Sequence, residues 1–526
     1  MRIPWLPVLW ACFLLRLLFY SSMLPLWEGY DEWAHFAVVR SVASGQLLPP
    51  RDGPVPRDVE ASLQIAPVPW EMRYLPPPSV SEDAFWTLPE AARVGRQAAF
   101  RAMPAAWSRE TAAGGLRAYE ALQPPLYYWL MAPLMRLASG LGLAWQVLAL
   151  RWAAALIASL AVPLVFALGK LVFADRGAAL GPAAVVTLMP GMALDVARVS
   201  NDCLAVVLFT LLTVWAVAAA RDGSKESVRR DWLLGLVLGL GLLTKAYFLT
   251  AVPALALVLG RRCWRPFLAA AAVAGWWYVR NLATTGTLTG LSESVMLRDL
   301  GVWGVLRRAP SLPFRTAADA ILFSHLYFGG WSSLTVRSWM YHLFFAVVLA
   351  AAIGLAWRWR ERPIRVLAAL YAAFWLGEFY NALLEWLSKG LPGSMGWYLY
   401  AVVGAEVVLC VAGIAALLPQ RFRGWTAPVG ALLFALFDLY TVHLVAIPYY
   451  SGMIRHKPNG APGTLHLADF RSVGWSGAFH RLSAFQALPE AALVMLWAAY
   501  LAATALALAA AFRSGRRANQ PAAGGK

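Results

Sequence analysis

The sequence predicts an all-α polytopic membrane protein with about 12 transmembrane helices. Of its 526 residues 60% are apolar, whereas apolar residues make up roughly half of a soluble chain. Uncharged runs such as residues 152–169, 203–220 and 491–512 approach or reach the roughly 20 residues that a helix needs to cross a bilayer. We expect helices because the strands of a membrane barrel would instead give short segments of alternating hydrophobicity.

The basic residues indicate how the chain is oriented in the membrane. A net charge of +17 would suggest a nucleic-acid partner in a soluble protein. Here, however, many Arg and Lys residues stand in short clusters between apolar runs, which is typical of cytoplasmic loops, so no nucleic acid is expected. With each cluster on the inside, the predicted spans are 5–25, 147–172, 178–198, 203–220, 232–244, 247–260, 266–283, 340–357, 364–387, 397–418, 425–447 and 489–512. The four cysteines lie in or beside apolar runs, without metal-site spacing, and are interpreted as packing residues.

This map divides the chain into two membrane regions and a tail. Residues 1–285 form a predicted catalytic module that includes a large outer loop, 26–123, with an irregular segment at 67–78 and an amphipathic helix at 90–103. Residues 125–139 are too short for a span and are predicted to lie at the interface or to re-enter the membrane. The second region, 286–512, carries outer loops at 284–339 and 448–488. The tail, 513–526, is basic and is predicted to be cytoplasmic and disordered.

Three ionisable residues follow the first span directly. Placing Asp31, Glu32 and His35 at a membrane surface costs free energy unless their charges are paired or take part in the protein's function. On a helix Asp31 and His35 are four residues apart and share a face, while Glu32 points elsewhere. One interpretation is an acidic helix cap. The other is that Asp31 is a general base, with Glu32 or His35 orienting it or binding a metal.

Further polar groups are predicted at the same outer face. Glu120 brings a second carboxylate there just before a Pro-Pro entry into a helix, and Asp202 lies in a turn where it would also serve as a helix cap. Lys245 lies at the tip of two short helices, where it either snorkels or is positioned for a phosphate. Arg280 ends a span and is followed by Asn281. An arginine there often anchors a helix, but together with Lys245 it would match an anionic lipid headgroup.

Five segments carry a family resemblance. They are Tyr30-Asp31-Glu32-Trp33-Ala34-His35-Phe36, Gln123-Pro124-Pro125-Leu126-Tyr127-Tyr128, Asn201-Asp202, Gly241-Leu242-Leu243-Thr244-Lys245 and Trp276-Trp277-Tyr278-Val279-Arg280-Asn281. In this order they resemble the GT-C superfamily of membrane glycosyltransferases, above all its protein-mannosyltransferase and aminoarabinose-transferase branch with many bacterial relatives. The resemblance covers about the first 285 residues.

The resemblance implies a GT-C fold and transfer of a sugar from a polyprenyl-phosphate carrier. The acceptor would be a lipid, glycan or protein at the outer face of the cytoplasmic (inner) membrane. Asp31 would be the base and Glu32 its partner. The substrate and its phosphate would contact Lys245, Arg280, Asn281, Glu120 and Asp202, and a divalent metal would involve His35 and Glu120. One departure bears on phosphate binding and on activity: relatives carry Gly-Arg-Tyr-Leu late in the chain, where this sequence has Trp397 in place of the arginine.

Two other functions are compatible with the sequence. A transporter or flippase of lipid-linked substrates would need ionisable residues near the bilayer midplane and internal repeats, and no repeat is evident. The candidates for such residues are Arg16, Asp195, Glu378, Glu406 and Asp438. The third possibility is a non-catalytic GT-C relative.

Overall fold

The computed structural model describes residues 4–74, 79–104, 115–221 and 228–518. In these ranges every regular element is a helix. The helices of the first half are α1 (Trp5–Met23), α7 (Leu143–Ser159), α8 (Ala161–Val172), α9 (Arg176–Leu188), α10 (Pro190–Val196), α11 (Asp202–Arg221), α12 (Val228–Leu242), α13 (Ala251–Leu259) and α14 (Trp264–Thr285). Those of the second half are α18 (Ser338–Arg358), α19 (Arg362–Lys389), α20 (Val403–Leu417), α21 (Thr426–Tyr440), α22 (Ile447–Tyr450) and α24 (Glu490–Ala518).

The predicted fold class, an all-α protein with many membrane spans, is confirmed, but the count of 12 spans is not. The described residues contain 9 helices that are long and apolar enough to cross a membrane, or up to 10 if the bent pair α9 and α10 forms one span. The predicted span 232–244 lies in α12, which has only 15 residues. The predicted spans 247–260 and 266–283 lie in one apolar helical stretch of 40 residues. That stretch is broken at Gly260, where φ is +55°.

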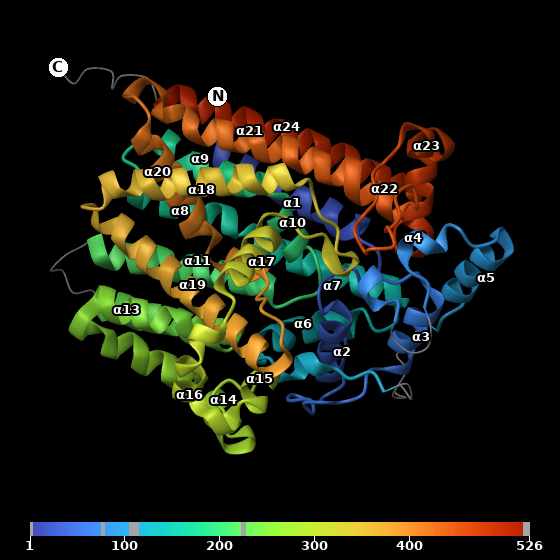
Figure 1. Ribbon diagram of the computed structural model, residues 1–526, viewed down its shortest axis with the longest axis horizontal. Helices are drawn as coiled ribbons and strands as arrows, with labels where there is room; N and C mark the ends of the chain where they lie inside the picture. Colours follow the sequence, from blue (N-terminus) through green and yellow to red (C-terminus); the bar gives the residue numbers. More distant parts are fainter. Residues whose placement is uncertain (1–3, 75–78, 105–114, 222–227, 519–526) are drawn as a thin grey trace.

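A buried ion pair ties the first span to two of the last. Arg16 on α1 donates two hydrogen bonds of 2.8 Å to the carboxylate of Asp438 on α21, and both side chains are fully buried. Tyr500 on α24 donates to the same carboxylate at 2.5 Å, and Tyr20 does so at 2.6 Å. A buried charge must be paired to be tolerated, so these contacts fix the packing of α1 against α24 that is visible in Figure 1.

Shorter helices cover the ends of the spans. Those of the first loop are α2 (Glu32–Ala43), α3 (Arg57–Ile65), α4 (Glu82–Phe85) and α5 (Glu90–Arg101), and α6 (Leu126–Leu137) follows the loop. Those of the second half are α15 (Ser292–Met296), α16 (Gly301–Arg307), α17 (Phe314–Leu326) and α23 (Leu467–Leu482). The predicted amphipathic helix at 90–103 corresponds to α5. The segment 125–139 forms α6, which has 12 residues and is not among the candidate spans. The predicted irregular segment contains a short helical turn at Trp70–Met72, and its residues 75–78 lie outside the described ranges.

The prediction of a disordered tail from residue 514 is wrong for its first residues. Helix α24 continues to Ala518, because Ser514 is buried and Gly515 packs closely against Pro428. Residues 519–526 lie outside the described ranges. The division of the chain at residue 285 stays a prediction.

Candidate active site

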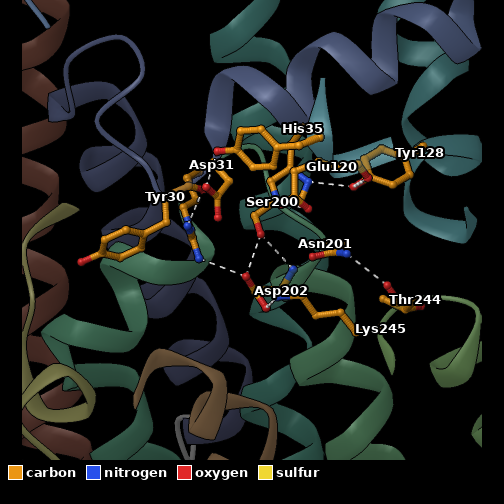
Figure 2. A network of polar contacts seen from close by, with 12 residues as sticks. Tyr30, Asp31, His35, Glu120, Tyr128, Ser200, Asn201, Asp202, Thr244 and Lys245 are labelled. Carbon is orange, nitrogen blue, oxygen red and sulfur yellow. Dashed lines mark hydrogen bonds and ion pairs between the residues drawn. The ribbon is translucent and has the colours of Figure 1, made fainter. Parts of the chain in front are cut away.

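Five segments of the chain meet at one polar network, shown in Figure 2. They are the start of α2, the helical turn Tyr119–Leu122, Tyr128 on α6, residues 198–202 at the start of α11, and Lys245 after the end of α12. The backbone N–H groups of Thr244 and Lys245 both donate to the backbone oxygen of Gly241, which closes the last turn of α12. The network therefore lies where the start of α11, the end of α12 and the first loop come together.

Asp31 occupies a strained position at the start of α2. Its φ of 55° and ψ of 15° place it in the left-handed region, which Asp tolerates better than most residues because its short polar side chain bonds locally. The residue is partly exposed, and its Oδ1 accepts a hydrogen bond of 2.5 Å from the Tyr119 hydroxyl. Backbone strain of this kind concentrates at functional sites.

His35 lies one turn along α2 and faces the same side as Asp31, as Figure 2 shows. Its Nδ1 lies 2.9 Å from the Tyr128 hydroxyl, and its Nε2 lies 3.6 Å from Oε2 of Glu120. The Tyr128 hydroxyl also lies 3.2 Å from the backbone oxygen of Glu120. The predicted residues Asp31, His35 and Glu120 are therefore brought together.

Glu32 points away from this group. It is fully buried and accepts two hydrogen bonds from Arg151 on α7, at 2.7 and 2.6 Å. Its Oε1 also accepts the backbone N–H of Val199 at 2.9 Å. Glu32 thus fastens α2 to α7 and to the segment that carries Asp202.

Asp202 joins two buried cations. Its carboxylate forms an ion pair with Lys245 through Oδ1 and another with Arg198 through Oδ2, the latter at 3.0 Å, and it accepts the Ser200 hydroxyl at 2.7 Å. Arg198 also donates to the backbone oxygen of Tyr30 at 2.6 Å. The residue just before Asp31 is therefore held by the same guanidinium that pairs with Asp202.

Arg280 and Asn281 lie beside the network without joining it. Arg280 lies over the ring of Trp277, with its guanidinium carbon 5.0 Å from the ring centroid, and lines a small cavity that Tyr128 also lines. Asn281 is buried and donates to the backbone oxygen of Thr289 at 2.9 Å. Across the described ranges, no hydrogen bond or ion pair connects either side chain to the network.

The surroundings of these groups change their protonation. Burial raises the pKa of Asp31, and the Tyr119 hydroxyl opposes part of that rise. Burial and the nearby Asp31 raise the pKa of Glu120 to about 8. Burial and the charge of Lys245 hold the pKa of His35 well below its usual range. At neutral pH, His35 is therefore neutral and Glu120 is largely protonated.

The predicted metal ligands supply an incomplete site. His35 and Glu120 face one another, but a bound zinc ion usually has at least three protein ligands. In the part of the chain that the structure describes, no three His, Cys, Asp or Glu side chains are grouped to hold an ion. The residues present do not fit a metal on their own, and metal binding by this pair stays a prediction.

Sequence reasoning did not predict three contacts of the network, and only one of them has a spacing signal. Tyr119 is 88 residues from Asp31, and no spacing signals their hydrogen bond. Arg198 could have been found, because it is three residues after Asp195 and four before Asp202, which suits one helical face. Trp397, at the position where the resemblance implies an arginine, stacks on Tyr30 with ring centroids 3.7 Å apart and an interplanar angle of 9°.

Comparison with known families gives one match. Residues 122–279 match the family described as Dolichyl-phosphate-mannose-protein mannosyltransferase. Over this segment the match confirms the resemblance to the protein-mannosyltransferase branch. The matched segment contains Asp202 and Lys245, and it excludes Asp31, Glu120 and Arg280. No curated protein matches the chain.

Solved GT-C structures are similar at a low level. ArnT from Cupriavidus metallidurans in the apo state has 15% identity and a TM-score of 0.38, covering 92% of this chain and 75% of that one. The apo oligosaccharyltransferase of Archaeoglobus fulgidus has 14% identity and a TM-score of 0.43, and the match covers 93% of this chain and 60% of that one. The structure of its complex with Zn and sulfate has 15% identity and a TM-score of 0.35, and the match covers 70% of this chain and 49% of that one. This chain therefore spans about half of that protein's length. Scores this low support no statement about the site of this chain.

Asp31 and Glu32 are expected to contribute differently to the free energy of unfolding. Glu32→Gln leaves Arg151 buried without its counter-charge, and we expect the free energy of unfolding to fall by about 3–5 kcal/mol. Asp31→Asn keeps a residue that tolerates the left-handed region and accepts the Tyr119 hydroxyl, so a change below about 0.5 kcal/mol is expected. Thermal unfolding of the detergent-solubilised variants measures both. A larger loss for Asp31→Asn than for Glu32→Gln would contradict these assignments.

Proposed function

We propose that this chain transfers a sugar from a polyprenyl-phosphate carrier to an acceptor hydroxyl at the outer face of the cytoplasmic membrane, with Asp31 as the general base. The observation that carries the proposal is the position of Asp31. It is partly exposed and strained in its backbone, and it lies in a network with two buried cations, Arg198 and Lys245. The family match over residues 122–279 supports the class of reaction.

The proposed reaction is a single displacement at the anomeric carbon of the sugar. The acceptor oxygen attacks this carbon, and the bond between the carbon and the phosphate oxygen breaks, which inverts the configuration. The proton of the acceptor hydroxyl moves to Oδ2 of Asp31, because Oδ1 already accepts the Tyr119 hydroxyl. The electron pair of the broken bond stays on the polyprenyl phosphate, which leaves as an anion.

Positive charge near the leaving phosphate would lower the barrier, since charge builds up there in the transition state. Lys245 is the proposed phosphate contact, and it is 6% exposed and pairs with Asp202. Asp202 holds the ammonium group in place and would share it with the phosphate. Arg280 is the second proposed contact, and its guanidinium lies over the ring of Trp277. Asn281 follows it on α14 and donates to the backbone oxygen of Thr289.

Glu120 has a different proposed role. A carboxyl with a pKa of about 8 is protonated at neutral pH and is able to donate a hydrogen bond. We propose that Glu120, beside His35, donates this hydrogen bond to a hydroxyl or phosphate oxygen of the substrate. Glu32 keeps Asp31 in position indirectly, through Arg151 and the backbone of Val199.

No observation favours the transporter alternative. The ionisable residues that it would use are engaged with partners inside the helical bundle, and paired groups suit a structural role better than movement of a charged substrate. The activity measurements below distinguish a non-catalytic relative from an enzyme. The engaged groups are Arg16 with Asp438, Asp195 with Arg198, Glu406 with His325 at 2.9 Å, and Glu378 with the Ser394 hydroxyl at 2.5 Å.

Removing the base tests the reaction directly. Asp31→Asn keeps the shape of the side chain but accepts no proton, so we expect sugar transfer to fall by about 10²- to 10⁴-fold. Transfer is measured in membranes with a polyprenyl-phosphate sugar and normalised to the amount of folded protein. Asp319→Asn, at an exposed ion pair on α17, is the matched control and should leave transfer unchanged. Undiminished transfer by Asp31→Asn would contradict the role of the base.

The pH dependence tests the contact with Tyr119. The base acts as a carboxylate, so activity is complete above the pKa of Asp31 and is lost as the pH falls through it. Tyr119→Phe removes a hydrogen bond that stabilises the charged form, which raises this pKa further. The acid limb of the pH profile of kcat/KM should therefore move to higher pH by about one to two units. Tyr74→Phe, at an exposed tyrosine, is the control, and an unmoved limb in Tyr119→Phe would argue against Asp31 as the titrating base.

A further inference from the structure

A second groove lies apart from the candidate active site. It has a volume of about 340 Å³, which is within the usual range of ligand pockets. Its walls come from three segments: residues 334–337, the end of α21 with the following helical turns to Tyr449, and the hairpin 454–465. The apolar part is lined by Leu334, Val336, Leu444, Val445, Ile454 and Leu465.

The groove opens where two candidate spans end. Tyr440 and Leu444 belong to the last part of the span Gln420–Tyr450, in which residues Thr441–Ala446 form a π-helix. Arg337 directly precedes the span Ser338–Arg358. Both walls thus combine an apolar membrane helix with a polar segment, which is the arrangement found at a membrane–water boundary. Local π-helical turns occur frequently at functional sites.

Two exposed cations line the groove. Neither Arg337 nor Lys457 has an ion-pair partner among the residues that the structure describes. Asp83, a carboxylate that contacts the hairpin, is occupied by His456, which donates its backbone N–H at 2.8 Å. The positive charge at the mouth of the groove is therefore available to a ligand.

We propose that this groove binds an anionic glycerophospholipid of the surrounding bilayer. The acyl chains would lie along Leu444 and Val445, and the phosphate would contact Arg337 and Lys457. An apolar wall that continues a membrane helix suits acyl chains, and two unpaired cations suit a phosphate diester. A free phosphate would use the cations but not the apolar wall, so the lipid is the occupant that matches both.

The groove is connected to the candidate active site by one short loop. The backbone oxygen of Phe328 accepts the Tyr30 hydroxyl at 2.7 Å, and the hydroxyl oxygen of Tyr30 accepts the Gly330 N–H at 3.0 Å. Six residues after Phe328, Leu334 enters the wall of the groove. A bound lipid would therefore steady the loop that packs beside Asp31. The proposed lipid site does not depend on the proposed reaction.

Lipid titration tests this proposal. Native mass spectrometry of the full chain in detergent would measure binding of phosphatidylglycerol and, for comparison, of zwitterionic phosphatidylcholine and of free glycerol phosphate. We expect wild type to prefer phosphatidylglycerol over both. The double variant Arg337→Gln, Lys457→Gln should bind it roughly 10- to 30-fold more weakly, as estimated for the loss of two cations near a membrane surface.

Two further variants separate the groove from general charge effects. Arg455→Gln removes an exposed cation two residues before Lys457 that does not line the groove, and it should bind phosphatidylglycerol like wild type. Leu444→Trp narrows the groove without changing charge and should weaken binding. Equal binding of the two lipids by wild type, or undiminished phosphatidylglycerol binding by the double variant, would overturn the proposal. Tight binding of glycerol phosphate alone would overturn the assignment to a lipid.

Discussion

The buried guanidinium of Arg198 is the contact on which the arrangement of the site depends. It donates to the backbone oxygen of Tyr30, immediately before Asp31, and pairs with the carboxylates of Asp195 and Asp202. A charge that is 2% exposed is tolerated only when it is paired and hydrogen-bonded. Asp202 in turn pairs with Lys245 at the end of α12. The start of α2, the segment before α11 and the end of α12 are therefore fixed relative to one another by a single set of charges.

Burial, together with this set of charges, changes how the neighbouring groups ionise. The same burial that raises the pKa of Asp31 lowers that of His35, because it disfavours the charged form of each. Glu120, beside Asp31, is kept largely neutral. Burial thus raises the pKa of both neighbouring carboxyls, and a hydrogen bond from Tyr119 opposes the rise at Asp31.

Apolar runs and residue spacing were enough to predict the fold class and the grouping of Asp31 with His35, since both depend on local periodicity. The number of spans was not predictable, because α12 is shorter than a bilayer is thick and the stretch after it bends at Gly260. Tyr119 reaches Asp31 through the tertiary packing of the first loop, for which the sequence carries no spacing signal. The guanidinium of Arg280 lies over the ring of Trp277, and its contact with a phosphate beside Lys245 stays a prediction.

The proposed reaction requires a lipid-linked sugar as the donor. Purified wild-type protein in lipid vesicles is incubated with a panel of labelled polyprenyl-phosphate sugars and, separately, with nucleotide sugars, and sugar transfer is measured. We predict transfer of at least one polyprenyl-linked sugar to a hydroxyl acceptor, with release of one polyprenyl phosphate per sugar and inverted configuration. Transfer from a nucleotide sugar alone, or from no donor in the panel, would contradict this account.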